Sequence, residues 1–217
     1  MDNSKLNQTE LSYESSAGTA KVNLVTGRLL YEHFDASVGL NDYNLSVSHI
    51  YNSHLGYNNK ISNSTGENWK LDIQQYLYYN DDETDTYTYI DAKGMEHTFE
   101  HLSGSEYYDT SGMGLILNVQ NSEKKITDLT GNEMYFKDEK LVKLKTNEGY
   151  VKIIEYDKNL FGKLTEIKSI YDPRDIGTKI NFEYDENSML TKINVHNGNL
   201  KYSMKYFYNN KSLLPHQ

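Results

Sequence analysis

The sequence predicts an all-β fold in which stacked antiparallel hairpins form a curved or spiralling sheet, with little or no helix. Apolar and polar residues alternate in window after window, and no window has the 3.6-residue period of an amphipathic helix. Tyrosine supplies 20 of the 217 residues, and aromatic side chains suit a pleated, half-buried surface. Clusters of Asn, Asp, Gly and Ser separate these windows and indicate turns.

The first half of the chain is the less regular part. Residues 1–17 are polar and aperiodic, so we expect a loosely ordered lead-in. Residues 18–125 form the β-strand region that opens the array. Its clearest strands are 45–51 and 69–73, where each apolar residue is followed by a polar one, which indicates one buried and one wet face.

Residues 126–208 repeat themselves, which indicates an array of similar units. Each unit has a glycine, an alternating strand, Tyr-Asp or its equivalent, a polar turn and a closing strand such as Leu-Thr-x-Ile. One hairpin cannot bury its own apolar face, whereas stacked hairpins can. Residues 209–217 are a tail.

The repeat assigns structural roles to its recurring residues. We expect Tyr156 and Tyr184 to pack between hairpins, and Asp157 and Asp185 to accept hydrogen bonds from turn backbone. The turn glycines are Gly149, Gly177 and Gly198, and Asn197-Gly198 is the strongest two-residue hairpin signal.

The Tyr156-Asp157 and Tyr184-Asp185 pairs, each followed by a turn and Leu-Thr-x-Ile, resemble the YD repeat of the RHS family. This family includes bacterial polymorphic toxins and wall-associated proteins. Upstream, the segments 22–30, 45–53 and 66–71 are similar to the stretch with which such repeat regions begin. Asn68 departs from the glycine that commonly precedes the family's tryptophan, and Tyr206-Phe207 replaces Tyr-Asp in the fourth unit.

The resemblance implies a non-catalytic structural segment of a shell that encapsulates or presents a toxin or effector, or that mediates cell-surface interaction. Its partners would be further repeats of the parent chain or a C-terminal effector domain. Such a parent would be secreted or lie on the surface of a bacterium, although this sequence shows no signal peptide. Trp69 would be a structural anchor. Because three and a half repeats are too few to enclose anything, we expect the function to be realised only in a larger assembly.

An alternative class is an independent carbohydrate-binding β-module. It requires aromatic rings that face solvent, and the candidates are Trp69, Tyr78, Tyr87 and Tyr89. Replacing Trp69 by Ala separates the two classes, since it would unfold a shell segment but would cost a folded module its glycan affinity.

Composition and spacing argue against several other functions. A formal charge of −9 does not favour nucleic acid, and the lack of cysteine removes thiolate metal sites and thiol nucleophiles. No stretch is apolar enough to suggest membrane insertion. No catalytic signature and no cofactor motif occur.

Two weak metal candidates remain. His97 and His101 have the spacing of zinc ligands on a helix, but they fall in a strand-like stretch that separates them. Asp81, Asp82 and Asp85 could hold calcium, although a solvated hairpin tip explains these charges more simply.

Overall fold

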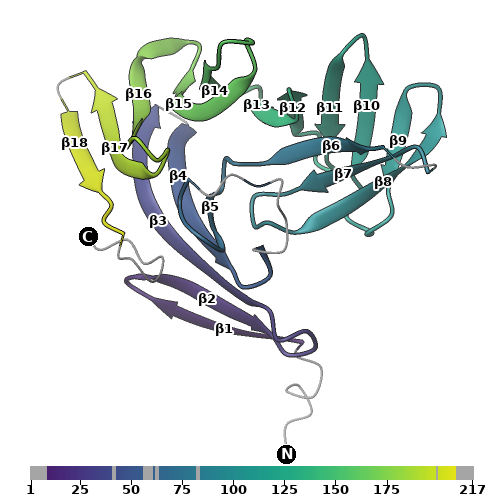
Figure 1. Cartoon of the computed structure of the whole chain (residues 1–217), viewed down its shortest axis with the longest axis horizontal. Helices are drawn as coiled ribbons and strands as arrows, with labels where there is room; N and C mark the ends of the chain where they lie inside the picture. The colour runs from purple at the N-terminus through teal and green to yellow at the C-terminus, as the bar shows by residue number, and fades with distance from the viewer. Residues whose placement is uncertain are drawn as a thin grey trace, which may run out of the picture.

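The computed structural model describes residues 9–40, 43–55, 61, 64–81, 84–198 and 200–208. Within this part of the chain there are eighteen strands, every pairing between them is antiparallel, and no α-helix occurs. The all-β prediction is confirmed. The strands form two sheets that enclose one main hydrophobic core (Figure 1).

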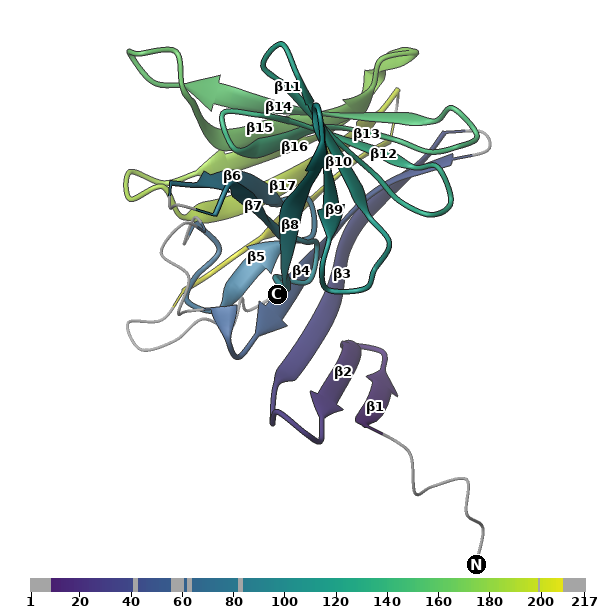
Figure 2. The ribbon, with the colours of Figure 1, turned by 90° about the vertical axis from the view of Figure 1, so that its right-hand side faces the viewer.

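The first sheet has the strand order β1-β2-β3-β4-β5. Strands β3 and β4 pair over their full length, with a bulge between Phe34 and Ala36. Both views show the β1–β2 hairpin extending away from the rest of the molecule (Figures 1 and 2). The strands are β1 (Glu10–Ser15), β2 (Gly18–Asn23), β3 (Leu29–Leu40), β4 (Tyr43–Asn52) and β5 (Trp69–Leu71).

Eight strands of the second sheet form a closed ring. Each strand from β6 to β13 pairs with the next along the chain, and β13 also pairs with β6 through Lys140 and Tyr76. Figure 2 views the molecule from the side of this ring. Its strands are β6 (Tyr76–Asn80), β7 (Thr86–Ile90), β8 (Glu96–Ser103), β9 (Glu106–Asp109), β10 (Ile116–Gln120), β11 (Glu123–Thr127), β12 (Glu133–Lys137) and β13 (Lys140–Lys145).

The remaining five strands continue the second sheet from β13 in chain order. They are β14 (Val151–Lys158), β15 (Leu164–Asp172), β16 (Asp175–Tyr184), β17 (Leu190–Asn197) and β18 (Leu200–Lys205). Within the described residues β18 pairs only with β17, so it is an edge strand. Strands β15, β16 and β17 lie against β3 and β4, and the two sheets thereby bury one core between them.

The structure divides the chain differently from the sequence prediction. Residues 10–15, which we expected to be loosely ordered, form β1, because their backbone pairs with β2 although all six side chains are exposed. No break occurs near residue 126, since β11 to β13 complete the ring, and the open extension begins at β14. Residues 209–217 lie outside the described residues.

Strands β5 and β7 are buried on both faces. Trp69, Lys70 and Leu71 of β5 are all buried, although the sequence pattern placed Lys70 toward solvent. The Lys70 ammonium donates to the backbone carbonyls of Asp91 and Ala92, at 3.0 and 2.7 Å. The turn between β7 and β8 covers this strand, and the carbonyls of that turn provide the acceptors that a buried ammonium needs.

Candidate functional site

The contacts between successive hairpins are the candidate functional feature of the repeat region. The Tyr156 hydroxyl, buried in the sheet, donates to the backbone carbonyl of Leu141 at 2.8 Å. Leu141 belongs to β13, the closing strand of the preceding unit. The tyrosine of one unit is therefore fixed to the backbone of the unit before it.

The same contact recurs in the later units. Tyr208 donates to the carbonyl of Leu190 at 2.7 Å, and the hydroxyl of Tyr184 is buried next to the backbone of Ile167 without a well-formed hydrogen bond. Leu190 and Ile167 both lie in the closing strand of the preceding unit. Burial raises the pKa of each of these tyrosines, so all three hydroxyls stay neutral.

Tyr208 explains the irregular fourth unit. The sequence prediction placed that unit's tyrosine at Tyr206, where Asp does not follow. In the structure Tyr206 packs instead on His49 of the first sheet, with ring centroids 4.8 Å apart, and Tyr208 makes the inter-hairpin hydrogen bond. In the sequence, Tyr208 is followed by Asn209, a pair similar to Tyr-Asp because Asn and Asp are both common turn residues.

A five-residue turn recurs between strands. Its first residue accepts an amide hydrogen bond from the fourth and donates its own amide to the carbonyl of the fifth. Where the first residue is Asp or Asn, its side chain also accepts from the third and fifth amides. The first residues of these turns are Asp91, Asp128, Thr146, Asn159 and Asp185. The fourth residues, all with positive φ, are Gly94, Gly131, Gly149, Gly162 and Ser188.

One residue that the repeat predicted for this turn lies outside it. Asp185 is a turn acceptor, as expected, but Asp157 lies within β14, and Asn159 accepts the turn amides in its place. Gly149 occupies the fourth position of a turn, and Gly198, with φ of +53°, lies between β17 and β18.

Gly177 is not a turn residue. It lies within β16, and the preceding turn is centred on Pro173 and Arg174, between the paired residues Asp172 and Asp175. Proline fixes its own φ near the value that such a turn requires, so no glycine is needed there.

Trp69 is buried at the contact of β4, β5 and β3, with only 4% of its surface exposed. Its ring meets Tyr31 edge-on at 6.1 Å between centroids and lies 5.3 Å from the ring of Tyr51. Such aromatic pairs favour a fixed arrangement, which is what an anchor residue provides.

Beside Trp69 a buried carboxylate joins two histidines. Asp35 lies at the bulge of β3 and accepts hydrogen bonds from Nδ1 of His33, at 3.0 Å, and Nδ1 of His49. Burial alone would raise the pKa of Asp35, but the charge of His49 and the bonds from both histidines hold it below its usual value. The hydrogen bond to Asp35 raises the pKa of His33. The bond between Asp35 and His49 links β3 to β4, and the His49 ring also packs on Tyr206.

The aromatic platform needed for the carbohydrate alternative is not present at the predicted residues. Tyr87 and Tyr89 point into the ring, where they pack with Phe99, and only 7% and 4% of their surfaces are exposed. Trp69 is buried as well, and Tyr78 is half-buried against a second small core. The side chains of a strand alternate between two faces, and the closure of the ring determines which of these faces is covered.

The described members of the two metal candidates do not form a site. Asp82 lies outside the described residues, and Asp85 accepts a hydrogen bond from the Tyr107 hydroxyl at 3.2 Å. Among the residues that the structure describes, no three His, Cys, Asp or Glu side chains lie together in a way that could hold a metal ion.

The fold does bring a serine, a histidine and an aspartate together. Nδ1 of His97 lies 2.8 Å from Oγ of Ser111, and its Nε2 lies 3.2 Å from a carboxylate oxygen of Asp91. The Ser111 hydroxyl also bonds to Asp109, and that carboxylate accepts the amides of Ser111 and Met113 as well. The amides of Ser111 and Met113 are therefore not free to bind an oxyanion beside the serine.

Comparison with known families gives one match. Residues 19–99 match a family described as a domain of unknown function, DUF6531. The DUF6531 match contains Asp35, His49 and Trp69, and it ends within β8, before the hairpin repeats. A search of curated proteins finds no match to the chain. In the described part of the chain, no helix has the length and apolar character to cross a membrane.

Proposed function

We propose that this chain is a non-catalytic wall segment of an RHS/YD-repeat shell, which encloses or presents a toxin or effector or acts at the cell surface. The observation that carries the proposal is the recurring bond from the tyrosine of one hairpin to the backbone of the hairpin before it. A contact of this kind lets an array grow by nearest-neighbour addition.

The open end of the array supports the same proposal. Among the described residues, strand β18 pairs with β17 alone, and exposed strand edges are normally covered in native proteins. Its side chains are almost all exposed, including Leu200 and Tyr202. A further hairpin of the parent chain would cover this edge and would repeat the contact that Tyr208 makes.

A protease-protection experiment on the product of the complete reading frame tests the proposal. We expect the strand array and the segment that it encloses to resist trypsin together. A Tyr156→Ala, Tyr208→Ala double variant should expose that segment to cleavage while the Tyr13→Ala control does not. If trypsin releases the present chain as an intact module and leaves the sensitivity of the rest unchanged, the chain is not part of a wall.

A further inference from the structure

A row of tyrosine and lysine side chains crosses the outer face of the second sheet. Strand register places its first members side by side. Tyr135 of β12 pairs with Lys143 of β13, and Lys143 pairs with Ile153 of β14. The lysine ammonium lies 3.4 Å from the centre of the Tyr135 ring. Strands β11 to β16 follow one another along the upper side of the molecule in Figure 1.

The row continues without a break to the edge of the sheet. Ile153 pairs with Tyr171, Tyr171 with Lys179, Lys179 with His196, and His196 with Lys201 of β18. Lys179 again lies over its tyrosine, 5.1 Å from the ring centre. Two equivalent tyrosine–lysine pairs therefore stand in one line.

This row points away from the core. The residues next to it along each strand are buried in the core between the sheets: Phe136, Ile154, Ile170, Ile180 and Val195. Because successive side chains of a strand point to opposite faces, the row faces the other side. Its members are half-buried or exposed, so a ligand could reach them.

The row carries positive charge that its surroundings do not neutralise. No carboxylate stands in it, and Lys143, Lys179 and Lys201 form no ion pair with the described residues. Three of the flanking acids are paired with lysines outside the row, since Glu133 bonds to Lys125 and Lys145, Glu155 to Lys168, and Glu183 to Lys192, whereas Glu123 forms no ion pair with the described residues. In a chain whose formal charge is −9, this face is a local cationic strip.

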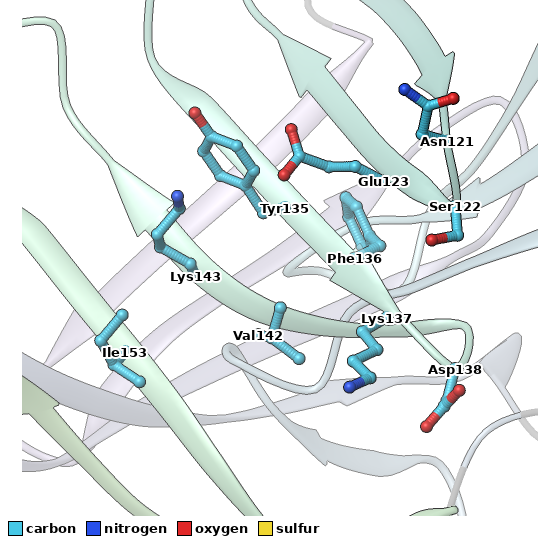
Figure 3. A pocket seen from close by; sticks show the side chains of 10 residues that line it. All are labelled: Asn121, Ser122, Glu123, Tyr135, Phe136, Lys137, Asp138, Val142, Lys143 and Ile153. Carbon is cyan, nitrogen blue, oxygen red and sulfur yellow. The ribbon is translucent and has the colours of Figure 1, made fainter.

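A hollow of about 750 Å³ lies at the Tyr135 end of the row (Figure 3). Lys143 and Ile153 line it together with Asn121 and Glu123, whose amide and carboxylate lie on the same side as the Tyr135 ring. An aromatic ring beside amide and carboxylate groups suits a sugar, which offers an apolar ring face and hydroxyl donors.

The spacing of the lysines indicates a sparsely charged ligand. Three strand steps separate Lys143 from Lys179 and two separate Lys179 from Lys201, or about 14 and about 10 Å at about 4.8 Å per step. Double-stranded DNA carries a charge about every 1.7 Å, which is far denser than this spacing of lysines. We infer that the row binds a linear acidic polysaccharide with carboxylates on only some of its sugars, whose rings lie against Tyr135 and Tyr171.

This inference does not rest on the shell proposal, and it involves none of the aromatic residues that the sequence prediction selected. Binding of a fluorescent hyaluronan oligosaccharide, in which carboxylates occur on alternate sugars, tests it. The row variant K143Q/K179Q/K201Q is compared with K93Q/K158Q/K163Q, which makes the same charge change at exposed lysines outside the row. Circular dichroism confirms that both variants are folded.

We expect the row variant to lose at least about tenfold in affinity, a loss of about 1.4 kcal/mol, and the control to change less than about twofold. A carboxyl-reduced oligosaccharide should bind the parent protein at least about tenfold more weakly. Equal losses in both variants would reduce the effect to net charge and overturn the inference. Tighter binding of single-stranded DNA than of hyaluronan would assign the row to nucleic acid. If hyaluronan does not bind, the inference is wrong and the row only stabilises the sheet.

Discussion

Removing the hydroxyl of Tyr156 tests the contact between hairpins with the least disturbance. Tyr156→Phe keeps the buried ring and deletes only the 2.8 Å hydrogen bond to the carbonyl of Leu141. The variant leaves a buried acceptor without this donor, which typically costs about 1–3 kcal/mol. Tyr156→Ala also removes the ring, and the cavity should bring the total to about 3–5 kcal/mol.

Urea denaturation gives these free energies of unfolding, provided that the slope of the transition is unchanged. For a chain of 217 residues, 1 kcal/mol corresponds to about 2–4 °C in Tm, so a loss of about 1–3 kcal/mol in Tyr156→Phe should lower Tm by about 2–12 °C. Tyr13→Phe is the matched control, because Tyr13 is 71% exposed and its variant should change stability by less than about 0.5 kcal/mol. A Tyr156→Phe variant as stable as the parent would show that the hydroxyl does not stabilise the array.

Three further predictions concern buried charge and the recurring turn. Burial lowers the pKa of Lys70 from 10.5 to about 8, so the folded protein binds fewer protons than the unfolded chain and becomes more stable as pH rises through this range. Relative to Lys70→Met, the free energy of unfolding of the parent should increase by about 1.3 kcal/mol between pH 7 and 9. Parallel stability curves for the two proteins would contradict this. Gly94 and Gly162 both have φ of +74°, but an added Cβ would lie 2.5 Å from Leu55 at Gly94 and would meet nothing within 4 Å at Gly162. Thermal melts should therefore show a cost of about 1 kcal/mol for Gly162→Ala and about 2 kcal/mol more for Gly94→Ala, and equal costs would show that Leu55 moves freely. Ser188 has φ of +59° where the other four turns have glycine, so Ser188→Gly should stabilise the protein by about 0.5 kcal/mol in urea, and a loss of stability would mean that the serine side chain is needed.

The sequence predicted the local features of the fold because they depend on neighbouring residues. Alternation identified the strands at 45–51, and the repeat identified hairpins with Tyr156 and Tyr184 at their contacts. The turns were predicted less accurately. Tyr-Asp drew attention to Asp157, whereas the five-residue spacing from Asn159 to Lys163 marks the turn itself.

Strand alternation and the hairpin repeat did not predict the contacts between segments that are distant in the sequence. The ring closes through Lys140 and Tyr76, which are far apart in the chain, and strand periodicity does not specify which edges will meet. The placing of Tyr87 inside the ring follows from that closure, and the burial of Lys70 follows from the β7–β8 turn that covers β5. The outer row of tyrosines and lysines depends on register across seven strands, so its members look unrelated in the sequence.

The shell proposal is tested most directly by an electron cryomicroscopy map of the product of the complete reading frame. The decisive feature is the edge of β18 that does not face β17. We predict that a strand from beyond residue 208 pairs along this edge and begins the next hairpin of the array. A map in which this edge is open to solvent, or is covered by an unrelated domain, would contradict the proposal.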